Sequence, residues 1–296
     1  MFSKPRLFLT QIILLLALGL SACAPFLTAS TPTPQAPTAT PMPPTATPPP
    51  AAATVNGEIV TLAEFQAELQ RYKSAQTALG KTVSDADANK IVLEDLIAQF
   101  LLAQAARDAK FELTETNLKS RIDALATQIG GAEALSAWRS AHGYDAAAFQ
   151  IALKRAAEAA WMRDKIIAEV PKTMEQVHLR QILTYNEAKV SAALEELKAG
   201  KDFDVIAARF DPITLGELGW TPRGYLLNAK ANDAALALQV GAYSDVIATN
   251  AGFHIFKVIE RGVHPLTPDA LLTMQELALK NWLAERRAKS AVVLAP

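Results

Sequence analysis

Two different spacings of apolar residues divide this chain at about residue 171. From Thr61 to that point apolar side chains recur every three or four positions, which predicts α-helices. From Val177 to Thr184 apolar and polar side chains alternate, which is typical of a strand with one buried face. The alternation returns at residues 253–258, and a helical pattern covers about residues 267–290. The pattern therefore predicts a helical region, a mixed region of strands and helices, and a closing helix.

Turn and capping residues mark where the elements of the helical region begin. Asn56-Gly57 separates two short apolar runs and predicts a hairpin, because both residues tolerate a positive φ. Thr61 and Glu64 form a capping box that opens a helix. Three further helical patterns follow the capping residues Ser84, Thr114 and Asp145. The helix after Ser84 is predicted to pack on two sides because its apolar face is broad: Val92, Leu93, Leu96, Ile97, Phe100, Leu101 and Ala103.

The mixed region carries its own turn and cap signals. A helix over residues 187–199 ends at Gly200, and Asp202 caps another over residues 203–210. A short helix is expected around residues 234–238. The stretch Gly241–Val258 then reads as a hairpin, with a turn at Asn250-Ala251-Gly252 and one histidine in its second strand.

Charge and cysteine content narrow the function classes. The formal net charge is −1 and there is no dense run of Lys or Arg, which argues against nucleic acid as a partner. His142 and His264 stand in predicted loops without a second ligand, so no metal site is expected. The single cysteine, Cys23, leaves no disulfide to form within the chain.

The N-terminus predicts export. Lys4 and Arg6 precede a mostly apolar run of 14 residues, Leu7–Leu20, whereas a helix that spans a bilayer needs ~20. A cleaved leader over residues 1–22 therefore fits better than a permanent span. Leu-Ser-Ala-Cys resembles the bacterial lipobox, which implies that Cys23 becomes lipid-modified and anchors the chain outside the cytoplasmic membrane. The alternative is an ordinary signal peptide followed by an incidental cysteine.

A proline-rich segment follows the cysteine. Residues 25–50 contain ten of the 17 prolines, interleaved with Thr and Ala, and there is no charged residue between Ala24 and Gly57. Such a composition cannot bury a core. We therefore predict a disordered tether over residues 23–53, extended at ~3.1 Å per residue, that acts as a spacer.

The order of motifs resembles a known family. The stretch VNGEIVTLAEFQAEL, with the helices that follow, is similar to the N-terminal chaperone segment of SurA- and PrsA-like extracytoplasmic foldases. Residues 176–262 resemble the parvulin (PpiC or rotamase) domain of peptidyl-prolyl cis-trans isomerases. The most specific matches are Val246–Val258, which reads VIATNAGFHIFKV, and Gly216–Trp220, which reads GELGW.

The resemblance implies an α+β fold. A parvulin domain, with a four-stranded antiparallel sheet surrounded by helices, is expected at residues 172–263. It would be inserted into a helical chaperone-like domain built from residues 54–171 and from residues 264–296, whose helix is expected to return and pack on the N-terminal helices. A lone amphipathic helix after a completed domain needs such a surface to bury its apolar face.

The resemblance also implies a site for an X-Pro peptide bond, without a cofactor, nucleophile or metal. Leu218 and Leu226 would belong to the socket for the proline ring, with Trp220 near its rim. The polar residues that match the family are His254 and Thr249.

Two positions depart from the family pattern. Gln181 stands where the family has its first histidine; His178, three residues earlier, would point to the opposite face of a regular strand. Asp211 is the candidate for the acidic member, in a loop that is shorter than in the family. The alternative is that Gln181 and His254 merely support the sheet of a fold whose activity has decayed.

Three functions are compatible with these features. The first is a membrane-tethered isomerase and foldase that acts on unfolded or nascent secreted proteins with X-Pro bonds. The second is a holdase chaperone whose parvulin domain only binds peptides. The third is an envelope scaffold that docks one partner on the sheet.

Overall fold

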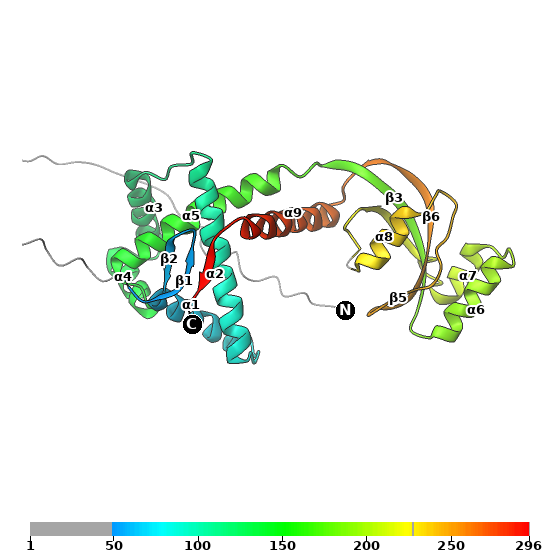
Figure 1. Cartoon of the computed structure of the whole chain (residues 1–296), viewed down its shortest axis with the longest axis horizontal. Coiled ribbons are helices and arrows are strands. Elements are labelled where there is room, and N and C mark those ends of the chain that lie inside the picture. Colours follow the sequence, from blue (N-terminus) through cyan, green and yellow to red (C-terminus); the bar gives the residue numbers. More distant parts are fainter. Residues whose placement is uncertain (1–48, 227, 296) are drawn as a thin grey trace, which may run out of the picture. The chain divides into compact units, whose positions relative to one another are not determined.

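The computed structural model describes residues 49–226 and 228–295, which form two compact units (Figure 1). The first unit extends to Met162 and resumes at Arg286; the second covers Arg163–Glu285. The predicted leader, Cys23 and the tether up to residue 48 lie outside the described residues. The tether prediction was wrong for its last three residues, because β1 begins at Ala51 and pairs with β2.

The first unit consists of helices and one small sheet. In chain order its elements are β1 (Ala51–Val55), β2 (Glu58–Thr61), α1 (Leu62–Ala78), α2 (Asp85–Asp108), α3 (Glu115–Gln128), α4 (Ala132–Ala141), most of α5 (Ala146–Ala168) and β7 (Val292–Leu294). The predicted caps are confirmed. The side chains of Thr61, Ser84 and Thr114 each accept a hydrogen bond from a backbone N–H three residues later, as does that of Asp145. Each such bond satisfies one donor that the first helical turn leaves free.

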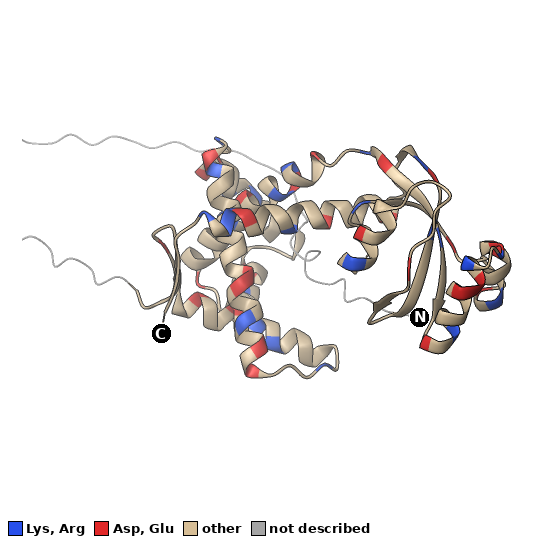
Figure 2. Cartoon of the chain, turned by 45° about the vertical axis from the view of Figure 1, so that its right-hand side comes forward, with Lys and Arg blue, Asp and Glu red and all other residues tan. Residues whose placement is uncertain are grey.

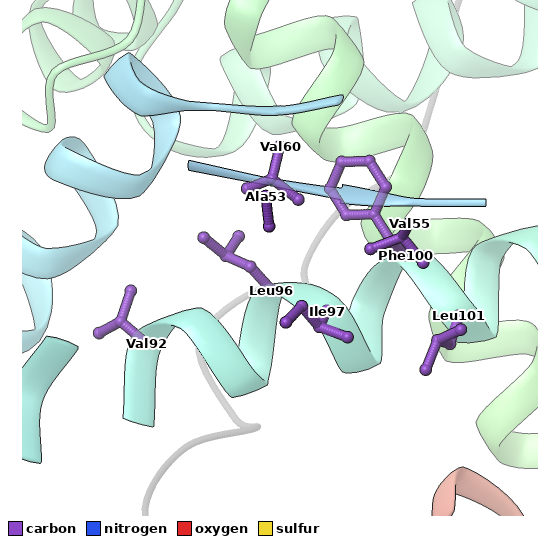
Figure 3. Close-up of a cluster of buried hydrophobic side chains, with 8 residues drawn as sticks. All are labelled: Ala53, Val55, Val60, Val92, Leu96, Ile97, Phe100 and Leu101. Carbon is purple, nitrogen blue, oxygen red and sulfur yellow. The ribbon is translucent and has the colours of Figure 1, made fainter. Parts of the chain in front are cut away.

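Helix α2 is the centre of the first unit. Its side chains pack against the two strands of the hairpin, as Figure 3 shows for Leu96, Ile97 and Phe100 beside Val55 and Val60. Residues 101–106 are all buried, which is more than a full helical turn. The prediction that this helix packs on two sides is therefore confirmed.

The C-terminal strand β7 completes the sheet of the first unit. The strand order is β2-β1-β7, with Val55 opposite Val292 and Ala53 opposite Leu294. Residues from both ends of the described chain thus lie side by side in one sheet. The sequence analysis did not identify this strand, because three residues are too few for alternation to be visible.

The closing helix α9 (Pro268–Ala288) differs from the expectation. Up to Glu285 it belongs to the second unit, and only its last residues belong to the first. In the second unit Leu277 lies beside Gly224, and Gln275 donates to the carbonyl of Ile167 in α5. The helix therefore has a surface within the second unit to pack on. The two compact units divide after Met162 and after Glu285, whereas the domain boundaries expected from the sequence lie at residues 171 and 264.

The second unit is built on a four-stranded antiparallel sheet with the order β4-β3-β6-β5. Its long central pair is β3 with β6, in which Thr173 lies opposite Pro265 and Thr184 opposite Phe253. The elements in chain order are β3 (Thr173–Thr184), α6 (Glu187–Lys198), α7 (Phe203–Phe210), β4 (Glu217–Pro222), α8 (Ala229–Ala237), β5 (Ile247–Thr249) and β6 (Gly252–Pro265). The predicted four-stranded antiparallel sheet is confirmed.

Helices cover both faces of this sheet, and alternate residues of each strand face them. Ile182 and Ile255 pack against α6 and α7. Leu179, Phe256 and Val258 pack on the other face, against α8. The residues of one strand that share a face are two positions apart, so this division decides which polar side chains can meet.

Charges of both signs are interspersed on the surface (Figure 2). On α6, for example, Glu196 pairs with Arg209 of α7 and with Lys201. Such pairs near the surface are screened by water and contribute little to stability. They nevertheless prevent a single-sign field over these helices.

Candidate functional site

A chain of three polar side chains lies on the face of the sheet that α8 covers. His254, on β6, is 8% exposed and is the central member. Its Nδ1 lies 3.1 Å from Oε1 of Gln181 on β3, and its Nε2 lies 2.9 Å from the hydroxyl of Thr249 on β5. Three strands thus each supply one residue. The sequence predicted all three, and the structure brings them together.

The hydrogen-bond partners define the state of the imidazole. An amide oxygen only accepts, so with Oε1 of Gln181 facing the ring, Nδ1 of His254 carries the proton. Nε2 is then an acceptor for the hydroxyl of Thr249. Burial lowers the pKa of His254 below its ordinary value, because the charged ring would lose hydration. The site therefore holds a neutral histidine at pH 7.

Thr249 is positioned by the turn between β5 and β6. Its hydroxyl oxygen accepts from the backbone N–H of Ala251 at 3.0 Å and lies 3.2 Å from the carbonyl oxygen of Gly252. Gly252 has a φ of 118°, and a Cβ there would lie 2.9 Å from the carbonyl oxygen of Thr184. Only glycine fits this close approach.

Apolar side chains surround the polar chain. The ring of Phe256 stacks on His254 with centroids 5.3 Å apart. Leu218 and Leu226, both predicted for the proline socket, are partly buried and pack against the cluster that contains Phe256. The sequence analysis missed two residues with the same environment, Leu238 and Ile247. Ile247 could have been found, because it precedes the predicted site residue Thr249 by two positions on one strand.

The loop before β4 closes directly on Gln181. The backbone N–H of Gln181 donates to the carbonyl of Gly216 at 2.8 Å. Gly216 has a φ of 72°, and a Cβ there would lie 1.9 Å from the carbonyl oxygen of Gln181. The first glycine of the GELGW motif is therefore required by contact as well as by backbone conformation.

Asp211 does not join the polar chain. Its carboxylate accepts hydrogen bonds from the backbone N–H groups of Ile213 and Thr214 and from the hydroxyl of Thr214. These bonds, led by that of the hydroxyl, lower the pKa of Asp211. Its role as the acidic member of the site was predicted; the structure shows it shaping its own loop, because the short loop uses the carboxylate to satisfy its backbone.

Trp220 was predicted near the rim of the proline socket, and the structure places it elsewhere. It lies opposite His178 on β3, and its ring stacks on the rings of His178 and His264, with centroids 5.2 and 3.6 Å away. His178 precedes Leu179, which faces α8, so this stack lies on the other face of the sheet. The register shift between Leu179 and Arg180 turns Trp220 away from Leu218.

His178 belongs to a separate charged group on that face. Its Nε2 lies 2.5 Å from Oε1 of Glu217, and Oε2 of the same carboxylate accepts from Arg180. Arg180 in turn pairs with Asp204 of α7. His178 thus lies on the face of the sheet opposite to Gln181, as expected for a regular strand. Within residues 49–226 and 228–295, no cluster of three or more candidate metal ligands is found.

Comparisons with known proteins find two matching family models. Residues 1–156 match the family described as the SurA-like N-terminal domain, and residues 171–260 match the PPIC-type PPIASE domain. The foldase protein PrsA of Clostridium kluyveri is 23% identical over 285 residues, covering 79% of this chain and 83% of that protein. The periplasmic chaperone PpiD of Haemophilus influenzae is 42% identical over 94 residues, covering 30% of this chain and 15% of that protein.

One solved structure is also similar to this chain, at lower identity. The crystal structure of the peptidylprolyl isomerase PrsA from Bacillus cereus is 19% identical, with a TM-score of 0.42 and coverage of 79% of this chain and 84% of that one. The SurA-like match alone covers more than half of the 296 residues. The chain belongs to the SurA-like family and carries a parvulin-type peptidyl-prolyl isomerase domain in its second unit.

Proposed function

We propose that the Gln181–His254–Thr249 chain and the apolar side chains beside it form the site at which this parvulin-type foldase isomerises X-Pro bonds of secreted or envelope proteins. The observation that carries the proposal is the buried, neutral His254, bonded on both nitrogens and bordered by apolar side chains. No ionised side chain takes part in this chain of hydrogen bonds.

The chemistry requires an environment rather than a nucleophile. Rotation of a peptide bond faces a barrier of ~18–20 kcal/mol that arises from amide resonance, which separates charge. An apolar surface that removes water from the bond destabilises the charge-separated planar form. Binding the twisted bond more tightly than either planar isomer then lowers the barrier.

The residues have distinct roles in this scheme. Leu218, Leu226 and Ile247 would hold the proline ring and exclude water. His254 and Thr249 would fix the polar border of the site, and Gln181 would keep Nδ1 of the imidazole protonated by accepting its hydrogen bond. The departure from the family histidine is thus compatible with a complete polar chain, because an amide also offers an acceptor oxygen.

A prolyl isomerisation assay tests this proposal. Residues 49–296 should accelerate the isomerisation of short Ala-X-Pro-Phe peptides and of a protein whose refolding is limited by proline. Leu226→Ala should lower kcat/KM about fivefold, since full burial of a leucine contributes ~1.5–3 kcal/mol and Leu226 is only partly buried. His254→Ala should also lower it.

Two matched controls lie on the other face of the sheet. Val205→Ala changes an exposed side chain of α7, and His178→Ala removes the histidine that lies on β3 itself. Both should retain wild-type rates. Equal rates in all four variants would show that the site is elsewhere. If the wild type failed to accelerate isomerisation of both the peptides and the refolding protein, catalysis would be excluded.

We also propose that the protein is lipid-anchored through Cys23 and acts outside the cytoplasmic membrane. The lipobox-like Leu-Ser-Ala-Cys supports the anchor, and the PrsA, SurA and PpiD relatives support the compartment. Within the described part of the chain, no helix is both long and apolar enough to cross a bilayer. Cys23→Ala should move the protein from the membrane fraction to the soluble one; retention of the variant in the membrane would contradict the anchor.

A holdase activity of the first unit is the second candidate. Trp138 is 38% exposed and Ile151 is 64% exposed, so apolar surface is available there for unfolded chains. The His254→Ala variant should then still suppress aggregation of a denatured client. If His254→Ala lost both aggregation suppression and isomerase activity, the two functions would share one site.

A further inference from the structure

The hairpin turn at Asn56-Gly57 is held by the C-terminal end of the described chain. These two residues connect β1 to β2 and have φ angles of 51° and 84°. They form the only Asn-Gly pair in the sequence. In an Asn-Gly pair the backbone nitrogen of glycine can attack the asparagine side chain readily, because no Cβ blocks its approach.

Every polar group of the Asn56 side chain has a partner from another segment. Its Oδ1 accepts from the backbone N–H of Ala291 at 2.8 Å, while its own backbone N–H donates to the carbonyl of Ala291 at 2.8 Å. Its Nδ2 donates to Oε1 of Gln104 at 2.7 Å and to the hydroxyl of Ser290 at 3.2 Å. Asn56 thereby extends the β1–β7 pairing by one residue beyond Val55.

These contacts oppose the attack of the Gly57 nitrogen on the Asn56 side chain, which would close a ring. For the attack, the side-chain carbonyl carbon of Asn56 must swing onto the nitrogen of Gly57. That movement breaks the hydrogen bonds to Ala291, Gln104 and Ser290 together, so the C-terminal segment must first open locally. The turn is otherwise exposed, and water for the later hydrolysis is available.

We infer that Asn56 is a deamidation site that the C-terminal segment protects, and that the modification releases this segment. The Gly57 nitrogen bonds to Cγ of Asn56, the side-chain nitrogen leaves as ammonia with the Gly57 amide proton, and a succinimide ring forms. Water then opens the ring at either carbonyl and gives aspartate or isoaspartate. The net change is loss of ammonia and gain of water.

The product is incompatible with the native contacts. An aspartate at position 56 has no side-chain N–H to donate, so its carboxylate faces the acceptor Oε1 of Gln104. Gln104 is buried, and rotating its amide would remove the donor that satisfies the carbonyl of Val55 at 2.8 Å. An isoaspartate also inserts a methylene into the backbone of the turn. Either product should weaken the attachment of β7 to β1.

Ageing of the full chain at pH 7.5 and 37 °C, followed by peptide mapping, tests this inference. Deamidation at Asn56 should be at least about tenfold slower than in a short peptide of the same sequence. Ala291→Pro, which removes the N–H that Oδ1 accepts, should restore much of the peptide rate. The matched control Ala295→Pro removes the bond from Ala295 to the carbonyl of Ala52, at the far end of β7, and should accelerate deamidation less.

A second measurement does not depend on whether the proline variants fold. In the unmodified chain, the slowing of deamidation should match the protection of the Ala291 amide against hydrogen exchange, because both need the same opening. Asn56→Asp should lower the protection of the Ala291 amide about tenfold or more. Deamidation at the peptide rate while the Ala291 amide stays protected would overturn the inference, as would unchanged protection in Asn56→Asp.

Discussion

Changing Gln181 to glutamate isolates the role of the neutral imidazole, because it alters charge and hardly changes shape. The substituted carboxylate oxygen would lie where Oε1 now lies, 3.1 Å from Nδ1 of His254. In the wild type, burial lowers the pKa of His254. In the variant, a carboxylate beside the ring favours the imidazolium, so the pKa should rise.

The magnitude follows from the contact distance. Two unit charges about 4 Å apart attract by ~4 kcal/mol at an effective dielectric constant of ~20. One pKa unit corresponds to ~1.4 kcal/mol, so the ceiling is a rise of about 3. Burial disfavours both charges and offsets part of this gain. We therefore expect the pKa of His254 to rise from its lowered wild-type value to above its ordinary one.

The sign of the pH dependence differs between the two proteins. In the wild type, the lowered pKa means that the unfolded chain binds the proton more tightly, so the free energy of unfolding decreases as the pH falls through about 6.5. In Gln181→Glu, the stabilisation from the ion pair is present below the unfolded pKa of histidine and is lost as the pH rises through the raised one.

The assay combines an NMR titration of the His254 ring with kcat/KM between pH 6 and 9. Wild-type activity should change little above pH 7, whereas Gln181→Glu should be weakly active near pH 7 and recover as the raised pKa is passed. Gln239→Glu adds the same charge at an exposed position and serves as the control. An unchanged titration of His254 in Gln181→Glu would refute the contact between residue 181 and the imidazole. Full activity of this variant at a pH where the ring is charged would refute the need for a neutral imidazole.

Two further predictions concern stability. Gly216→Ala should lower the stability of the second unit by at least ~2 kcal/mol, because its Cβ would clash with the carbonyl of Gln181 in addition to the strained φ; Gly241→Ala, with a φ of 85° but open space, should cost only ~1–2 kcal/mol. If the urea midpoints of unfolding, followed at the β3 amides, were similar in the two variants, the expected difference in stability would be contradicted. Glu158→Gln removes a carboxylate that is 3% exposed and paired with an arginine, and should cost about 2–3 kcal/mol. Glu115→Gln removes one that is 80% exposed and should cost less than ~1 kcal/mol, so equal thermal shifts would disprove the burial argument.

Most of the fold was predictable from local signals. The caps at Thr61, Ser84 and Thr114 and the alternation in β3 and β6 depend on neighbours within a few residues, which the sequence displays directly. Strand β7 was not predictable, because three residues give no period and its partner β1 is more than two hundred residues away. The division of α9 between the two units also depends on surfaces that form only on folding.

The site shows the same division between local and tertiary information. The spacing of Thr249 and His254 across a turn, and the equivalence of Gln181 to a family histidine, were enough to predict three residues that the structure joins. The placements of Asp211 and Trp220 were wrong. The carboxylate of Asp211 turns toward its own short loop because that loop has backbone donors to satisfy. Trp220 turns to the other face of the sheet because of a register shift.

The sequence by itself determined most of the elements that form, because capping, turns and periodicity are properties of neighbouring residues. Tertiary structure decided which side chains meet. A register shift of one residue moves a side chain to the other face of a sheet, and no local pattern records it. For this protein that distinction separates His254, bonded within the site, from Trp220, stacked on the far face of the same sheet.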